Sequence, residues 1–178
     1  VRTIELEDLV IRYNITDDAQ RILHDLDMRL SSGLVPSSRL DEKRRLMLTV
    51  SSIMEESIAS SQLEGASTTT KAAKKMLREN AVPKNRSERM IVNNYNAMRF
   101  IKEHSGDELS PDLIRTIHSV ISCGTMDDER YEGRFRDDDS IAVRDIFSSE
   151  TYHDPPDFGR IPDLIQALCD FANDDRVF

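Results

Sequence analysis

The sequence lacks the residue patterns of a disulfide-stapled protein or a nucleic-acid binder. Its 178 residues include two cysteines, Cys123 and Cys169, without the spacing of metal ligands, so we expect isolated thiols rather than a disulfide or a redox pair. Asp and Glu outnumber Lys and Arg by 33 to 24, which gives a net charge of -9. Because phosphate binding requires a basic surface, this balance argues against a nonspecific nucleic-acid binder.

Long apolar runs are also missing. No stretch of the sequence approaches the roughly 20 apolar residues that a membrane-spanning helix needs. The segment from Val1 to Val10 contains interspersed acids and has neither the basic start nor the apolar centre of a signal peptide. We therefore expect a cytoplasmic protein without a membrane partner. The sequence leaves the oligomeric state open, a homo-oligomer included.

What the sequence does contain is helical periodicity. With 38% hydrophobic and 32% charged residues, the chain can form one or two packed domains. Thr16 is a suitable N-cap for the first helix, and Ser110-Pro111 is the usual start of a later one. Helices are predicted at residues 13–29, 41–63, 69–80, 87–104, 109–122 and 161–172.

The helical period is lost between Cys123 and Pro156. Within this region, Ser140 to Ile146 alternates loosely and is rich in β-branched residues, which predicts a short hairpin. The adjacent acids Asp137 to Asp139 are interpreted as a solvated turn, because a Mg²⁺ site needs ligands that converge from separate places.

Other candidate sites have simpler interpretations. His118 lies on a predicted helix without nearby metal ligands and is interpreted as a structural histidine. His153 lies in a turn, where its acidic neighbour points the opposite way, so we do not predict acid-base chemistry there. Given the acidity of the whole chain, a local basic run is interpreted as a solvated helix face: Lys71, Lys74, Lys75 and Arg78.

The helix predicted over 41–63 has an apolar stripe that turns polar. At 100° per residue, hydroxyls and a carboxylate continue the line of its apolar side chains to within about 40°. A charge that points into a core is costly unless it is paired. Glu64 therefore either extends into solvent, with Gly65 ending the helix, or meets an arginine elsewhere, and spacing leaves both open. The stripe consists of Leu46, Val50 and Ile53, then Ser57, Ser60 and Glu64.

The run Ser60 to Thr69, SSQLEGASTT, resembles the inhibitory-helix motif of Fic-domain proteins: a Ser or Thr, three residues, then Glu-Gly. In the class it resembles, the inhibitory helix precedes the catalytic core. Further segments resemble the family in the same order. Leu109 to Ser122 resembles the first core helix, and Tyr131 to Arg136 (YEGRFR) resembles the Gly-x-aromatic-Arg segment before the flap. Tyr152 to Asn173 resembles the Pro-Pro turn and the helix that follows it. The resemblance spans about Leu46 to the C-terminus.

The resemblance implies a mainly α fold, a Fic-like helical bundle with one β-hairpin flap. Residues 1–105 would form an N-terminal helical region with the inhibitory helix at about 41–64. Residues 106–178 would form the front of the Fic core, with the flap at about 137–150. The catalytic signature of the family, His-Pro-Phe-x-x-Gly-Asn-Gly-Arg, is absent. We therefore predict no catalytic residue in this chain, expect it to be inactive alone, and expect the complete protein to continue past Phe178 into the signature.

The activity that the resemblance implies is protein adenylyltransfer, in which AMP moves from ATP to a Ser, Thr or Tyr hydroxyl of a target protein. ATP and Mg²⁺ would be held by the signature, so this chain would supply no metal ligand. Glu64 would pair with the last arginine of the signature, which otherwise grips the γ-phosphate. Ser60 and Gly65 would support that helix end. An exposed flap edge would hold an extended target segment through main-chain pairing: Ile141, Ala142 and Val143.

A second hypothesis belongs to another class of protein. The chain could be a stand-alone inhibitory or interaction module that acts on a separate Fic catalytic partner. Such an inhibitory module needs little beyond the inhibitory helix, whereas this chain also resembles the first core helix, the flap and the next helix. A generic helical domain with coincidental matches is the third hypothesis. Whether the encoded product continues past Phe178 into the signature distinguishes these hypotheses.

Overall fold

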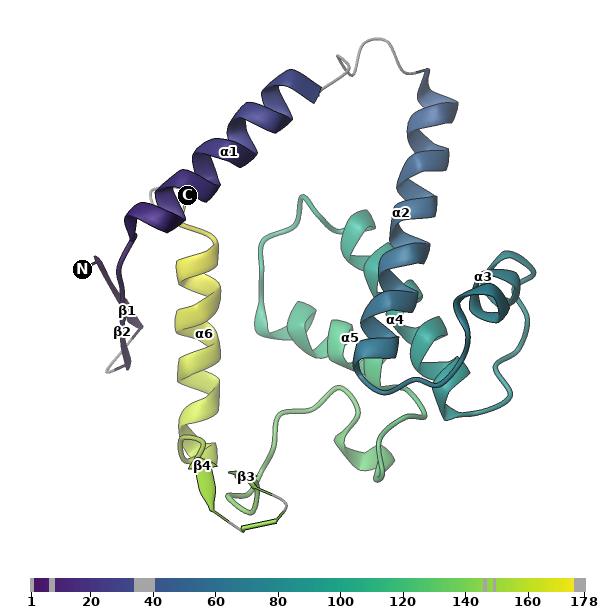
Figure 1. Cartoon of the computed structure of the whole chain (residues 1–178). Helices are drawn as coiled ribbons and strands as arrows, with labels where there is room; N and C mark the ends of the chain where they lie inside the picture. Colours follow the sequence, from purple (N-terminus) through teal and green to yellow (C-terminus); the bar gives the residue numbers. More distant parts are fainter. Residues whose placement is uncertain (1, 7–8, 34–40, 146, 149, 175–178) are drawn as a thin grey trace. The chain divides into compact units, whose positions relative to one another are not determined.

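The computed structural model describes residues 2–6, 9–33, 41–145, 147–148 and 150–174 (Figure 1). The chain is mainly helical, at 59% helix, with six α-helices and two small two-stranded antiparallel sheets among the described residues. The predicted mainly α fold is confirmed. The chain divides into two compact units, Val1–Ser52 and Ile53–Phe178. No described helix has both the length and the apolar composition that crossing a membrane requires.

The first unit contains a β-hairpin that the sequence pattern did not predict. Strand β1 (Arg2–Leu6) pairs antiparallel with β2 (Leu9–Tyr13), from Arg2 opposite Tyr13 to Leu6 opposite Leu9. The predicted helix start at residue 13 is therefore wrong, because Tyr13 ends a paired strand. Helix α1 (Asp17–Gly33) begins after Thr16, whose Oγ1 accepts a hydrogen bond from the Ala19 amide at 3.2 Å, as an N-cap does.

Helix α2 (Glu42–Leu63) begins in the first unit and ends in the second. Asp41 precedes it, and its Oδ1 accepts a hydrogen bond from the Arg44 amide at 2.7 Å. This bond satisfies one of the amides that have no partner inside the first helical turn. The helix predicted over 41–63 is confirmed to within one residue at its start.

The second unit holds the other helices and the second hairpin. The predicted boundary between residues 105 and 106 lies inside this unit, where α4 and α5 pack against each other. Its elements after α2 are α3 (Thr70–Arg78), α4 (Arg86–Glu103), α5 (Pro111–Ser122), the 3₁₀ turn η2 (Glu129–Tyr131), β3 (Val143–Arg144), β4 (Thr151–His153), the 3₁₀ turn η3 (Phe158–Arg160) and α6 (Ile161–Ala172).

Side-chain caps explain where three of these helices begin. Thr69 caps α3 through the Ala72 amide, and Ser110 caps α5 through the Leu113 amide at 3.2 Å. Before α4, Asn85 Oδ1 accepts from the Glu88 amide at 2.9 Å, and Glu88 Oε2 accepts from the Lys84 amide at 2.7 Å. These bonds fix the first turn of each helix.

The core of the second unit lies where the C-terminal half of α2 meets α3 and α4. Ile58 and Ile91 are almost completely buried at its centre, at 1% and 0% exposure, and Val92 and Tyr95 pack against the cluster. The buried members are Met54, Ile58, Ala66, Ala73, Met76, Leu77 and Ile91. This cluster fixes the part of α2 that carries the Ser60-to-Gly65 motif.

The buried face of α2 differs from the predicted stripe. Ser57 is buried as predicted, but Ser60 is only half-buried, and Leu46 and Val50 are 63% and 40% exposed. The core face runs through Met54, Ser57, Ile58 and Ser61. The predicted stripe is therefore wrong at both ends. Adjacent residues of a helix point about 100° apart, so Ser61 lies on the buried face and Ser60 does not.

Helix α6 agrees with its predicted bounds but buries less of its apolar face than predicted. Only Cys169 is fully buried among its described residues, and burial raises the pKa of its thiol. Leu168 is 40% exposed, and the other apolar members of the stripe are half-buried: Ile161, Leu164, Ile165 and Phe171. Cys123 is exposed, and both thiols are free, in agreement with the prediction of no disulfide.

Candidate regulatory site at the end of helix α2

Helix α2 ends in a Schellman motif centred on Gly65. The Ala66 amide donates to the Ser61 carbonyl at 2.8 Å, and the Gly65 amide donates to the Gln62 carbonyl at 3.1 Å. Gly65 has φ +97°, a conformation that side chains with a Cβ rarely adopt. The prediction that Gly65 ends the helix is confirmed, and Glu64 becomes the last residue before the turn.

The side chain of Glu64 extends into solvent. Glu64 is exposed, and its carboxylate forms no hydrogen bond or ion pair with any residue that the structure describes. Its amide donates to the Ser60 carbonyl at 3.0 Å. The Ser60 hydroxyl instead donates to Glu56 Oε1 at 2.8 Å, so Ser60 supports Glu64 through the main chain only. Of the two alternatives that spacing left open, this chain therefore shows the solvent-exposed one.

Leu63, next to Glu64, is 90% exposed. An isolated exposed leucine is common on protein surfaces. Here it adjoins an unpaired carboxylate at the same helix end, so the tip of α2 presents one apolar and one anionic side chain. We call Leu63 and Glu64 the α2 tip.

Polar contacts hold the last turns of α2 against α4. The amide nitrogen of the Asn94 side chain lies 3.3 Å from the Ser61 hydroxyl and 3.4 Å from the Ser57 carbonyl. The buried Ser57 hydroxyl donates to the Ile53 carbonyl at 2.6 Å and lies 3.3 Å from Met98 Sδ. Because both serines are small, the two helices can approach closely at this point.

The connection from α2 to α3 is also fixed. The Gln62 side chain donates to the Thr68 carbonyl at 2.8 Å, across the turn that contains Gly65. The Ser67 amide donates to the Ser87 hydroxyl, near the start of α4, at 3.2 Å. The motif therefore lies in a rigid corner with its carboxylate outside.

A hairpin with a largely exposed surface begins inside the predicted flap region of about 137–150, but its second strand, Thr151–His153, lies beyond that region. Strand β3 pairs antiparallel with β4, Val143 opposite His153 and Arg144 opposite Thr151, with an irregularity between the two pairs. Ile141 and Val143 are 55% and 54% exposed. Of the three predicted flap residues, Val143 lies in the strand, while Ile141 and the half-buried Ala142 precede it. Among the residues that the structure describes, no hydrogen bond joins this hairpin to Glu64 or Ser60.

Asp145 organises the hairpin loop. Its Oδ1 accepts from the amides of Ser148 at 2.6 Å and Phe147 at 2.8 Å, and its Oδ2 accepts from the Tyr152 hydroxyl at 3.0 Å. These bonds, led by the one from the Ser148 amide, lower the pKa of Asp145 to about 2. Phe147 itself is 97% exposed.

Arg136 closes the base of the hairpin. Its side chain is only 12% exposed, and it donates to Asp139 Oδ1 at 2.5 Å and to the Pro156 carbonyl. Asp139 Oδ1 also accepts from the Phe158 amide at 2.8 Å. The hydrogen bond from Arg136 lowers the pKa of Asp139. The residues before and after the hairpin are thereby tied together.

Helix α5 supports the segment that leads to the hairpin. His118 Nδ1 accepts a hydrogen bond from the Gly133 amide at 2.9 Å. This bond agrees with the interpretation of His118 as structural. At the end of α5, the buried Asn93 side chain donates to the carbonyls of Ile121 at 3.1 Å and Cys123 at 2.7 Å.

The three adjacent acids form the turn that the sequence predicted. Asp138 Oδ1 accepts from the amide of Ser140 at 2.8 Å, and the Ser140 hydroxyl lowers the pKa of Asp138. Within the described part of the chain, no group of three or more His, Cys, Asp or Glu side chains could hold a metal ion.

The sequence did not predict several long-range contacts that position these elements. Asn93, Asn94 and Arg136 act on partners that are 20 to 37 residues away, and no local pattern indicates those contacts. Asp145 had a signal, since an Asp before a short polar loop is typical of a turn in which the side chain accepts from following amides.

Comparisons with known proteins identify no relative of this chain. No family model, no curated protein sequence and no solved structure matches it.

Proposed function

We propose that this chain is the regulatory and front portion of a protein adenylyltransferase of the Fic type, autoinhibited by Glu64. The complete protein would move AMP from ATP to a hydroxyl of a target protein. The observation that carries the proposal is the α2 tip: Glu64 is exposed without a partner among the described residues at a Gly65 helix end, on a helix whose last turns are buried against α4. This geometry leaves the carboxylate available to a cationic group of another segment.

The order of the following elements supports the same proposal. After the motif come α5, which begins at Pro111, a short hairpin at residues 143–153, and α6 after the Pro155-Pro156 turn. This is the order in which the family places its first core helix, flap and next helix. The exposed β3 edge would accept an extended target segment by main-chain pairing.

The proposed inhibition is electrostatic competition. In the complete protein, Glu64 would pair with the last arginine of the catalytic signature and occupy the group that should bind the γ-phosphate of ATP. A charge-assisted hydrogen bond contributes about 1.5–3 kcal/mol, which corresponds to roughly a ten- to a hundred-fold bias against productive ATP binding. A misplaced γ-phosphate also misplaces the α-phosphate at which the target hydroxyl attacks.

ATP and Mg²⁺ would be held by the signature, outside the residues of this chain. When bound, ATP and Mg²⁺ would supply the activated phosphate groups. The residues of this chain would have two other roles. Its α2 tip would regulate how the nucleotide binds, and its hairpin would position the target segment.

The proposal is tested by measuring which phosphate of labelled ATP is transferred to protein. The complete gene product, incubated with ATP labelled at the α-phosphate and a cell extract, should transfer label to protein, whereas γ-labelled ATP should give none. The 178-residue chain alone is the matched control and should transfer neither label. Transfer from γ-labelled ATP would indicate a kinase instead. If the complete product transfers no label but reduces labelling by a separate Fic enzyme, the stand-alone inhibitory module is the correct hypothesis.

A further inference from the structure

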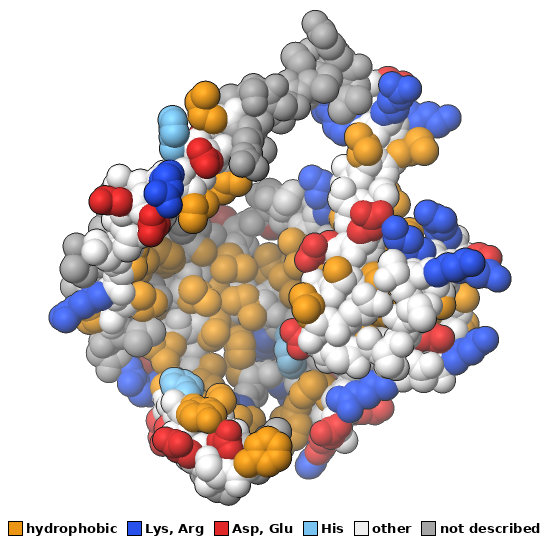
Figure 2. All heavy atoms as spheres, viewed as in Figure 1, with side chains coloured by type: hydrophobic (Ala, Val, Ile, Leu, Met, Phe, Trp, Pro, Cys, Tyr) orange, Lys and Arg blue, Asp and Glu red, His pale blue; other side chains and the backbone are white. Residues whose placement is uncertain are grey.

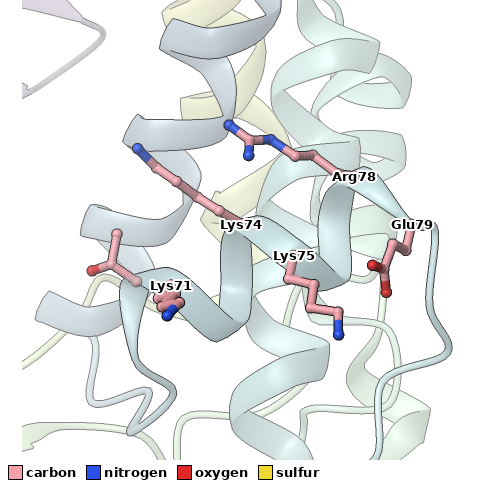
Figure 3. A pocket seen from close by; sticks show the side chains of 6 residues that line it. Lys71, Lys74, Lys75, Arg78 and Glu79 are labelled. Carbon is pink, nitrogen blue, oxygen red and sulfur yellow. The ribbon is translucent and has the colours of Figure 1, made fainter.

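The outer face of α3 is a concentrated positive surface in an acidic chain. The helix buries Ala73, Met76 and Leu77 and leaves its cationic side chains outside. A hollow of about 610 Å³ lies along these side chains; its lining also includes Thr70 and one acid, Glu79, and Figure 3 shows the labelled side chains. In Figure 2, blue side chains gather over the position of α3. We call the four cations the basic face: Lys71, Lys74, Lys75 and Arg78.

Most of the charge of the basic face is not neutralised by the described part of the chain. Lys74 Nζ pairs with Glu55 Oε1 on α2 at 2.7 Å. Lys71, Lys75 and Arg78 form no ion pair with any residue that the structure describes. Elsewhere, ion pairs with acids neutralise six described arginines: Arg21, Arg86, Arg99, Arg115, Arg130 and Arg136. The basic face therefore retains charge that a partner can neutralise.

The spacing of the basic face indicates the chemistry of that partner. Lys71 and Lys75 are four residues apart, as are Lys74 and Arg78, which gives two columns with about 6 Å between neighbours. Figure 3 shows Lys74 and Arg78 extending in one direction from α3 and Lys75 in another. Carboxylates at i and i+4 of a helix have the same spacing, and alternate residues of an extended strand are about 6.6 Å apart.

A protein partner fits better than a nucleic acid. The basic face extends about 11 Å along α3, so it could contact only a few phosphates. The net charge of -9 would repel the rest of a polyanion. A short acidic protein segment can place its charge on the basic face without bringing further negative charge near the acidic remainder of the chain. We infer that the basic face of α3 docks an acidic segment of a partner protein, independently of the proposed transfer reaction.

The inference is tested by nuclear magnetic resonance titration of the ¹⁵N-labelled full chain. The probe is a synthetic helical peptide with glutamates at i and i+4, and the same peptide with glutamines is the probe control. We expect shifts of the α3 amides with the glutamate peptide only, decreasing as salt is added. Replacing Lys71, Lys75 and Arg78 together by Glu should weaken binding by at least about ten-fold, as expected for three exposed charge pairs.

Two further variants make the test decisive. The triple Gln variant at the same positions removes the positive charge without adding repulsion. It replaces the triple Glu variant in the binding test if that variant does not fold. A matched triple variant, Lys84→Glu, Lys102→Glu and Arg134→Glu, changes exposed cations outside α3 and should keep the affinity. The inference is overturned if the wild-type chain shows no shifts, if both triple Glu variants lose binding equally, or if single-stranded RNA shifts α3 at lower concentration than the peptide.

Discussion

At the scale of single residues, Gly133 has a backbone conformation and a neighbourhood that suit only glycine. Its φ is +66°, and an added Cβ would lie 2.8 Å from Ser119 Cβ and 3.2 Å from the Arg115 carbonyl oxygen. Arg115 contributes backbone of α5, which cannot move aside as a flexible side chain can. The close approach also allows the Gly133 amide to reach His118. The glycine of the YEGRFR segment thus fixes how the segment crosses α5.

We predict that Gly133→Ala lowers the free energy of unfolding by about 1–3 kcal/mol, because the substitution adds both strain at positive φ and a contact with α5. Urea unfolding followed by circular dichroism measures the change. Gly106→Ala is the matched control, because no atom lies within 4 Å of an added Cβ there. Equal stability of Gly133→Ala and Gly106→Ala would contradict this account of the glycine.

At the scale of elements, local patterns predicted the helices well. Thr69, Asn85 and Ser110 satisfy the first amides of three helices, and such caps depend on neighbouring residues only. The helices predicted over 69–80, 87–104 and 109–122, which these residues cap, agree with the structure to within two residues.

Elements that depend on pairing or on packing were predicted less well. The β1–β2 hairpin was missed because the residues between its strands, Glu7-Asp8, include no glycine or asparagine, which usually indicate a two-residue connection. The predicted face of α2 contained Ser60, whereas Ser61 is the buried serine, and the Asn94 side chain that contacts Ser61 lies 33 residues away. Contacts at that separation leave no periodic signal in a single sequence.

The β3–β4 hairpin gives a prediction for its pH dependence. The pKa of Asp145 is lowered from 3.8 to about 2 by hydrogen bonds that are stronger to the carboxylate than to the neutral acid. The stabilisation is therefore fully present above pH 3.8 and is lost as the pH falls through about 2. We expect the amide signals of Phe147 and Ser148 to move with a midpoint near pH 2 in a nuclear magnetic resonance titration.

Asp145→Asn is the control for this titration. An amide oxygen can still accept from the loop amides but does not titrate, so the variant should show no transition in that range. A midpoint near 3.8 for the Phe147 amide in the wild-type protein would show that the carboxylate is not held by these bonds.

At the scale of the whole molecule, the proposed function places regulation and catalysis in different parts of one protein. The second unit carries the α2 tip, the hairpin and α6, which together support the proposal of a Fic-type front portion. The sequence predicted Glu64 and Gly65 through the motif, and it could not predict the partner of the carboxylate, because the described residues contain none. The central claim is that Glu64 restrains a reaction carried out by other residues.

The measurement that tests this claim most directly is AMP transfer by the complete protein with and without the Glu64 carboxylate. Glu64→Gly should increase transfer of label from α-labelled ATP by about ten- to a hundred-fold, because the arginine of the signature is freed for the γ-phosphate. Glu79→Gly is the matched control, since Glu79 is an exposed glutamate at the end of α3, and it should leave transfer unchanged. Equal labelling by the wild type and Glu64→Gly would contradict the inhibitory role of Glu64.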